Sequence, residues 1–218
     1  QNNNDIKQFE ACKTEGHPVV MFDRITGEID CDKVVVDDLN DAYLATSHLI
    51  GMNCKKPALV SAIDFLGVGQ LRVKGFEKAV NEKFGSVDDE LILRTSVEDL
   101  EERVNTLLTR HHPDGIFAVD EDASLAIQKV AKMNGLHIPD DLALIGYAGE
   151  KMAKNLTPAL TTVNQNGVSI GESAARILID RLEHGGEGFV TKVISTNIEN
   201  RQSTARKKGI QDQNNTNI

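Results

Sequence analysis

Polar and aromatic side chains follow several apolar runs of the sequence, at the points where predicted strands end. They are Asp23-Arg24, Asp37-Asp38, the stretch 63–72, Asp120-Glu121-Asp122 and Gly146-Tyr147. Ligands of open α/β sheets bind beyond the carboxyl ends of the strands, so we expect these side chains at one edge. Carboxylates accept hydrogen bonds from hydroxyl groups, arginine donates a planar fork, and aromatic rings pack against apolar faces. The set predicts a site for a small polyhydroxylated ligand.

Helix capping is the alternative interpretation of several of these carboxylates. The run 120–122 stands where an N-cap and a first helical turn are expected, and Asp37-Asp38 could cap a helix over 42–50. Arg72 is harder to explain in this way, because a cation early in a helix opposes the helix dipole. Ligand binding and capping both stay open for the acidic residues, and a plain surface position stays open for Arg72.

No recognised catalytic pattern occurs in the sequence. Gly67-Val68-Gly69 begins like a dinucleotide-binding fingerprint, but Arg72 occupies the place of its third glycine. The 6 histidines lack metal-ligand spacing, and three adjacent acidic residues at 120–122 cannot all face one ion, so a metal-dependent enzyme is disfavoured. The 3 cysteines form no CxxC pair and fit reduced thiols. We expect no enzyme activity, no catalytic residues, no metal and no cofactor.

Short β-branched runs alternate with helical patterns along the chain. Predicted strands cover 18–22, 33–36, 58–62, 91–93, 115–119, 142–145 and 192–195, and predicted helices include 71–83, 122–134 and 168–183. Most runs are continuously apolar, which is typical of parallel strands covered on both faces. This order of elements indicates a doubly wound α/β fold.

The composition is that of a globular protein with an acidic surface. The 218 residues are 40% hydrophobic and carry a net charge of −9, which argues against this segment gripping nucleic acid itself. No apolar stretch approaches the ~18 residues that cross a membrane, and the first residues do not resemble a signal peptide. We expect a cytoplasmic location, no membrane contact and a flexible tail over 206–218.

Eight motifs occur in the order found in one protein family. They are PVVMFDR (18–24), VVDDLNDAYLATSHLI (35–50), RVKGFEKAV (72–80), PDGIFAVDEDASLAI (113–127), IPDDLALIGY (138–147), TPALTTVNQ (157–165), IGESAARILIDRLE (170–183) and NRQST (200–204). With them the chain resembles the effector-binding core of the LacI/GalR family of bacterial transcription regulators, related in fold to periplasmic sugar-binding proteins. The resemblance implies a two-lobed periplasmic-binding-protein-like (type I) fold, with the effector in the cleft between the lobes.

In the family fold the chain crosses three times between the two lobes, and these crossings set the expected lobe boundaries. Residues 1–53 and 166–190 would belong to the N-terminal lobe, and residues 54–165 and 191–205 to the C-terminal lobe. Residues 1–53 hold only two predicted strands, too few for a stable sheet unaided. In the family, a helix-turn-helix and further strand–helix repeats precede this region. The resemblance therefore implies an N-terminally truncated chain with an incomplete, sheet-poor first lobe.

Individual effector contacts also follow from the resemblance. The expected effector-binding residues are Asp23, Phe65, Val68, Arg72, Asp120 and Tyr147. Arg72 matches the arginine that begins the R-x-x-G-F helix and binds effector hydroxyl or carboxylate groups. Ala148 replaces the Asp that usually accepts from an effector hydroxyl, so the effector's identity cannot be inherited from relatives. Asp37-Asp38 replaces a usual D-N pair and makes the cleft more acidic.

The function implied is that of an effector sensor in a DNA-binding transcription regulator. A small sugar-like metabolite would bind between the lobes of a homodimer, and operator DNA would bind a helix-turn-helix domain absent from this chain. The alternative is a periplasmic solute-binding protein that supplies a sugar transporter and has the same fold. A helix-turn-helix in the upstream coding sequence would favour the first, and a secretory leader the second.

Overall fold

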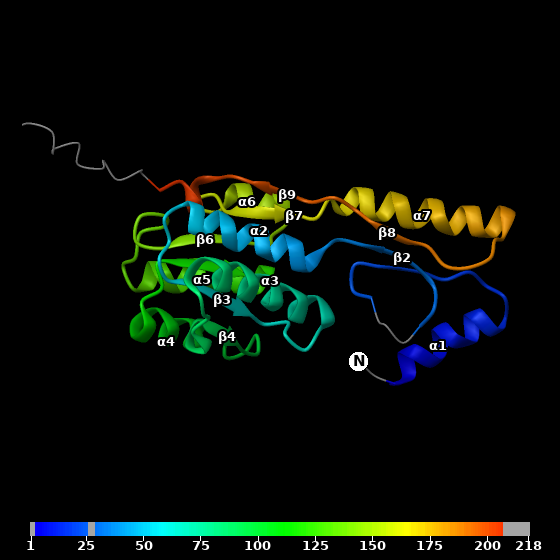
Figure 1. Ribbon diagram of the computed structural model, residues 1–218, viewed down its shortest axis with the longest axis horizontal. Coiled ribbons are helices and arrows are strands. Elements are labelled where there is room, and N and C mark those ends of the chain that lie inside the picture. Colours follow the sequence, from blue (N-terminus) through cyan, green and yellow to red (C-terminus); the bar gives the residue numbers. More distant parts are fainter. Residues whose placement is uncertain (1–2, 26–28, 207–218) are drawn as a thin grey trace, which may run out of the picture.

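The computed structural model describes residues 3–25 and 29–206, which fold into a larger and a smaller lobe (Figure 1). The helices are α1 (Asn3–Thr14), α2 (Asp38–Gly51), α3 (Gly67–Phe84), α4 (Leu100–Thr106), α5 (Glu121–Met133), α6 (Glu150–Asn155) and α7 (Gly167–His184). The strands are β1 (Val20–Phe22), β2 (Asp32–Val35), β3 (Pro57–Ser61), β4 (Ile92–Arg94), β5 (Gly115–Ala118), β6 (Ala143–Gly146), β7 (Thr161–Asn164), β8 (Thr191–Val193) and β9 (Asn197–Glu199). Chain segments cross between the lobes after β2, after β7 and after β8.

The larger lobe is built on a sheet with the strand order β4-β3-β5-β6-β7-β9. All its pairings are parallel except that of β7 with β9. β3, β5 and β6 are buried at every position, because their continuous apolar runs are covered on both faces. The predicted doubly wound α/β architecture is confirmed.

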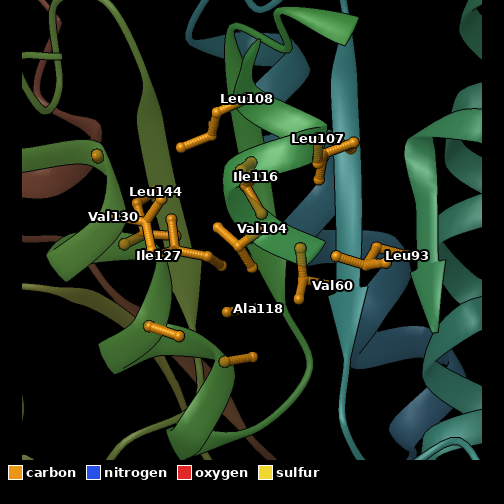
Figure 2. Packing of buried hydrophobic residues seen from close by; sticks show 14 of the residues in the cluster. Val60, Leu93, Val104, Leu107, Leu108, Ile116, Ala118, Ile127, Val130 and Leu144 are labelled. Atoms are coloured by element: carbon orange, nitrogen blue, oxygen red, sulfur yellow. The ribbon is translucent and has the colours of Figure 1, made fainter. Parts of the chain in front are cut away.

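Two apolar clusters cover the faces of this sheet. Figure 2 shows one of them, in which Val104 of α4 and Ile127 of α5 meet Ile116 of β5. On the opposite face, side chains of α2 and α3 such as Leu49 and Phe76 meet the other side of the same strands. α2 and α3 lie so close that a Cβ at Gly75 would collide with the backbone carbonyl oxygen of Leu39. Glycine is therefore required where these helices touch.

The smaller lobe has a parallel sheet of β1, β2 and β8. α7 packs on it through Ile170 and Ala174, which meet Val34 and Val36. Arg181 of α7 binds both carboxylate oxygens of Asp32 at 2.8 Å, so this helix is also held by a bidentate ion pair. The described part of residues 1–53 contributes two strands, as the sequence predicts.

The structure places two segments in different lobes from those predicted. The resemblance implies that residues 1–53 belong to the N-terminal lobe, but Ala42, Ala45 and Leu49 of α2 are buried against the larger sheet. The resemblance implies that residues 191–205 belong to the C-terminal lobe, but β8, which lies within this range, pairs with β2 in the smaller sheet. In both cases the chain crosses between the lobes at a point displaced from the predicted boundary.

The end of the described chain is anchored at the larger sheet. In the NRQST motif, the Ser203 hydroxyl accepts from the Thr161 amide at 2.7 Å and donates to the Leu144 carbonyl at 2.5 Å. Arg206, predicted to begin a flexible tail, donates from Nε to the Pro139 carbonyl at 3.0 Å. That prediction is wrong for this residue, and the rest of the predicted tail lies outside the described residues.

Between residues 3–25 and 29–206, no helix has the length and apolar character that crossing a membrane would demand.

Candidate ligand-binding site

A cavity of about 580 Å³ lies between the two lobes, at the carboxyl ends of their strands. The smaller lobe contributes the end of β1 and the first turn of α7. The larger lobe contributes the segments that follow β3, β5 and β6, and the crossing segment after β7 completes the wall. Of the six predicted site residues, Asp23, Val68, Arg72, Asp120 and Tyr147 line this cavity. Phe65 does not line it and is 78% exposed.

Arg72 is held rigidly in the wall by contacts on three sides. Its Nε and Nη2 atoms each lie 2.7 Å from Oδ1 of Asp38, and Nη1 donates to the Val119 carbonyl at 2.6 Å. The guanidinium carbon lies 3.6 Å from the centre of the Tyr147 ring. Both charged side chains of the pair are only 6% exposed. The guanidinium is therefore preorganised, and a carboxylate balances its charge.

Asp38 is the counter-charge of Arg72, a role that the sequence does not predict. Its neighbour Asp37 caps α2 by accepting from the Asn40 amide at 3.0 Å, which confirms the capping interpretation for Asp37. Asp38 instead turns inward to Arg72. Burial raises the pKa of the Asp38 carboxyl, with Arg72 acting in the opposite direction and Asp23 adding to the increase.

The carboxylates after β5 satisfy backbone groups. Asp120 accepts from the amides of Ala123 at 2.8 Å and Ala62 at 2.9 Å, one on each oxygen. It therefore caps α5 and links the ends of two strands, as the capping alternative required. Glu121 accepts from the Gly149 amide at 3.0 Å through Oε2. Both residues still line the cavity.

Asp23 comes from the opposite lobe. It follows β1 with a φ of 61°, a left-handed conformation that non-glycine residues rarely adopt. Its carboxylate is 49% exposed, and its nearest cation is Arg24, 4.0 Å away. Asp23 is thus an available carboxylate on the smaller-lobe side of the cavity.

The crossing segments carry polar groups that are not among the predicted site residues. Gln165 lines the cavity, and its buried Nε2 has no hydrogen-bond partner among the described residues. Asn166 donates from Nδ2 to the Ser195 carbonyl at 2.6 Å and so ties two crossings together. A second link is the hydrogen bond that Thr196, in the crossing segment after β8, donates to Asp41 of α2. The run of three amide side chains Asn164-Gln165-Asn166 is the sequence signal that could have pointed to these residues.

Asp41 is buried beside the Arg72 pair. One of its oxygens accepts from Thr196, and the other has no partner among the residues described. Burial raises the pKa of Asp41 to about 6, and the charges of Asp38 and Asp37 act in the same direction. The ionised form of this group is therefore costly in the folded protein.

The arrangement suits recognition of a polar small molecule. No three His, Cys, Asp or Glu side chains of the described ranges group as metal ligands. The cavity wall instead offers carboxylate acceptors, a fixed guanidinium, amide side chains and an aromatic ring. Such groups exchange hydrogen bonds with hydroxyls on both faces of a ligand.

The amino-acid sequence is similar to a known domain family and to curated transcription regulators. Residues 46–204 match the family described as the periplasmic binding protein-like domain. The transcriptional regulator DegA of Bacillus subtilis (strain 168) is 30% identical over 167 residues, which are 76% of this chain and 50% of the relative. The ribose operon repressor of Halalkalibacterium halodurans is 32% identical over 168 residues, again 76% of this chain and 50% of the relative. The chain thus spans about half the length of these curated relatives.

Solved structures show the same architecture. A LacI family transcriptional regulator from Enterococcus faecium with bound ribose superimposes with a TM-score of 0.82 at 27% identity, covering 95% of this chain and 77% of the other. The complex of the regulator CelR with cellobiose gives 0.80 at 26% identity, covering 88% and 60%. The family match, the regulators among the relatives and these structures point to the same family. The chain belongs to the periplasmic binding protein-like family, in the form that this domain takes in LacI-family transcription regulators.

Proposed function

We propose that this domain is the effector sensor of a bacterial transcription regulator and binds a small sugar-like metabolite between its lobes. The observation that carries the proposal is the interlobe cavity, with Arg72 fixed over Tyr147 in its wall. A ligand that touches both lobes binds one lobe arrangement better than another, and it shifts the equilibrium by that difference in affinity.

The relatives support regulation over transport. DegA and the ribose operon repressor are named as regulators of transcription, and the ribose and cellobiose complexes are those of transcription regulators. The solute-binding protein predicted as the alternative shares the fold but has less support from these relatives. A sugar-like ligand for this chain is favoured by the wall chemistry and by the sugars in the two related structures.

A ligand screen with a matched pair of variants tests the site. The melting temperature of the chain would be measured with D-ribose, cellobiose and a panel of pentoses and hexoses. A sugar present at 100 times its Kd stabilises the fold by about 2.7 kcal/mol, which corresponds to roughly 5 to 10 °C for a chain of this size. Val68→Trp should abolish the shift, because Val68 lines the cavity.

Val97→Trp is the control, since Val97 is exposed and lies outside the cavity lining. It should keep the ligand-induced shift. A shift that survives Val68→Trp but not Val97→Trp would place the ligand elsewhere and contradict the proposal.

The same proposal includes two macromolecular partners, a second copy of this protein and operator DNA. We infer a cytoplasmic homodimer whose operator contacts come from a helix-turn-helix domain outside this chain. Exposed apolar side chains on α5 and α7, among them Met133 and Leu182, supply surface that self-association would cover. Sedimentation velocity of the full-length protein should give a dimer, and an operator mobility shift should change with the bound sugar. A monomer that ignores operator DNA would contradict both expectations.

A further inference from the structure

We propose that the cavity selects its ligand by charge: it favours an amine-bearing polyol, such as an amino sugar, and rejects phosphorylated or acidic sugars. This inference rests on the proposed function, because it concerns the ligand of the same site.

The buried arginine offers hydrogen bonds but little net charge. A free guanidinium in the wall would attract phosphate or carboxylate groups. In this cavity Nε and Nη2 of Arg72 both lie 2.7 Å from Asp38, and both side chains are almost fully buried. An anionic ligand would have to share this cation with a carboxylate already in contact, at the additional cost of bringing two negative charges together.

Two other lining carboxylates are neutralised by neighbours. Glu150 forms an ion pair with Lys154, and Glu199 forms one with Arg201. Asn164 also donates to Glu199 at 2.6 Å. These groups contribute little to the net charge seen by a ligand.

Three lining carboxylates remain against one exposed cation. The three are Asp23, Asp120 and Glu121. Among the described residues, neither Asp120 nor Glu121 is in contact with a cation. The cation beside Asp23 is Arg24, whose side chain is 63% exposed and lies 4.0 Å away. Three negative charges against one positive charge leave a local net charge of −2. The field in the cavity is therefore negative.

Asp23 and Glu121 are the groups best placed to hold a cation. They line the cavity from opposite lobes, and the described residues put no hydrogen-bond donor on Oε1 of Glu121. An ammonium group has three donors and a full charge, so it could bind one or both carboxylates. Contact with both lobes would also couple amine binding to lobe closure.

The donors of the cavity suit the neutral part of such a ligand. The first turn of α7 has neither an acidic residue nor a side-chain cap, so its amide groups can donate to hydroxyl oxygens. The remaining N–H groups of Arg72 can do the same. The expected ligand therefore carries hydroxyls together with an amine, rather than a second anionic group.

Matched sugar sets separate charge from shape. The first set consists of D-glucose, D-glucosamine, D-glucose 6-phosphate and D-gluconate. The second set consists of the corresponding galactose derivatives, and the third consists of D-ribose and D-ribose 5-phosphate. Each compound would be titrated calorimetrically into the chain at pH 7. We expect the amine-bearing member to bind about tenfold more tightly than the neutral one, and the anionic members at least about tenfold more weakly.

Variants test whether the named carboxylates cause the preference. The double substitution Asp23→Asn with Glu121→Gln should reduce the amine-to-neutral affinity ratio to about one. Glu172→Gln is the control, since Glu172 lies on the exposed face of α7 outside the cavity lining, and it should leave the ratio unchanged.

The outcomes distinguish this inference from the proposed function. Tightest binding of a phosphorylated or acidic member, equal binding of the amine and neutral forms, or a preference that survives the double substitution would overturn the charge inference and leave the sugar site standing. Absence of binding by every member of all three sets would overturn both.

Discussion

The pair of Arg72 and Asp38 allows the central geometry to be tested without knowing the ligand. Arg72→Met removes the guanidinium and leaves the Asp38 carboxylate buried without its counter-charge. Breaking a buried ion pair in this way costs about 3–5 kcal/mol of unfolding free energy. The carbonyl of Val119 also loses its donor, which costs about 1–3 kcal/mol when the group stays dry. Proton uptake by Asp38, whose pKa burial already raises, offsets part of the total, so we expect about 3–5 kcal/mol overall.

Combining the two substitutions gives the coupling free energy between Arg72 and Asp38. Asp38→Asn alone should destabilise the fold, because the guanidinium then lacks its counter-charge. Arg72→Met combined with Asp38→Asn should cost less than the sum of the single changes by about 2–3 kcal/mol, since no buried charge is left. Each free energy would be measured by urea unfolding followed by far-ultraviolet circular dichroism at pH 7. Additivity within about 0.5 kcal/mol would show that the two side chains do not interact and would refute the geometry.

Four further substitutions probe the elements that hold the site. Asp120→Ala should lower the unfolding free energy by about 1–2 kcal/mol, because the α5 cap is lost; an unchanged urea midpoint would contradict the capping geometry. Gly75→Ala should cost at least about 1–3 kcal/mol through overpacking between α2 and α3, whereas Gly171→Ala in open space on α7 should stabilise by about 0.5–1 kcal/mol; equal urea midpoints for the two variants would be the contrary result. Asp41 has a folded-state pKa of about 6, above its ordinary 3.8, so its contribution to stability is lost as pH rises from about 4 to 6. Asp41→Asn should therefore stabilise the protein more at pH 7 than at pH 4, as measured by urea unfolding at both values, and a pH-independent effect would contradict the burial of this carboxyl.

Apolar runs made the larger sheet predictable. β3, β5 and β6 lie within two residues of their predicted ranges, because continuous burial on both faces demands continuous apolar sequence. The sequence predicts no strand at β7 or β9, because Thr161–Asn164 and Asn197–Glu199 are mostly polar. Their polar groups are instead satisfied by hydrogen bonds, such as that from Asn164 to Glu199, which periodicity does not reveal.

The site was predictable where a strand end decides a residue's position. Arg72, Asp120 and Tyr147 reach the cavity because they follow, or face, the carboxyl ends of parallel strands. Phe65 was misplaced because it lies in a loop, where sequence says nothing of side-chain direction. The sequence leaves both ligand binding and capping open for Asp38. It does not reveal the ion pair with Arg72, because the two residues are 34 positions apart and only the packing of α2 on α3 brings them together.

The hydrogen bonds among the connectors between the lobes have a mechanical consequence. Asn166, in the crossing segment after β7, is hydrogen-bonded to Ser195, in the crossing segment after β8. Thr196 of that last segment is hydrogen-bonded to Asp41 of α2, and α2 follows the first crossing segment, after β2. The three crossing segments should consequently bend together, so that the two lobes rotate about one common axis. Ligands of different shape would then produce the same displacement, and natural variation could alter the cavity wall while the mechanical output stayed constant.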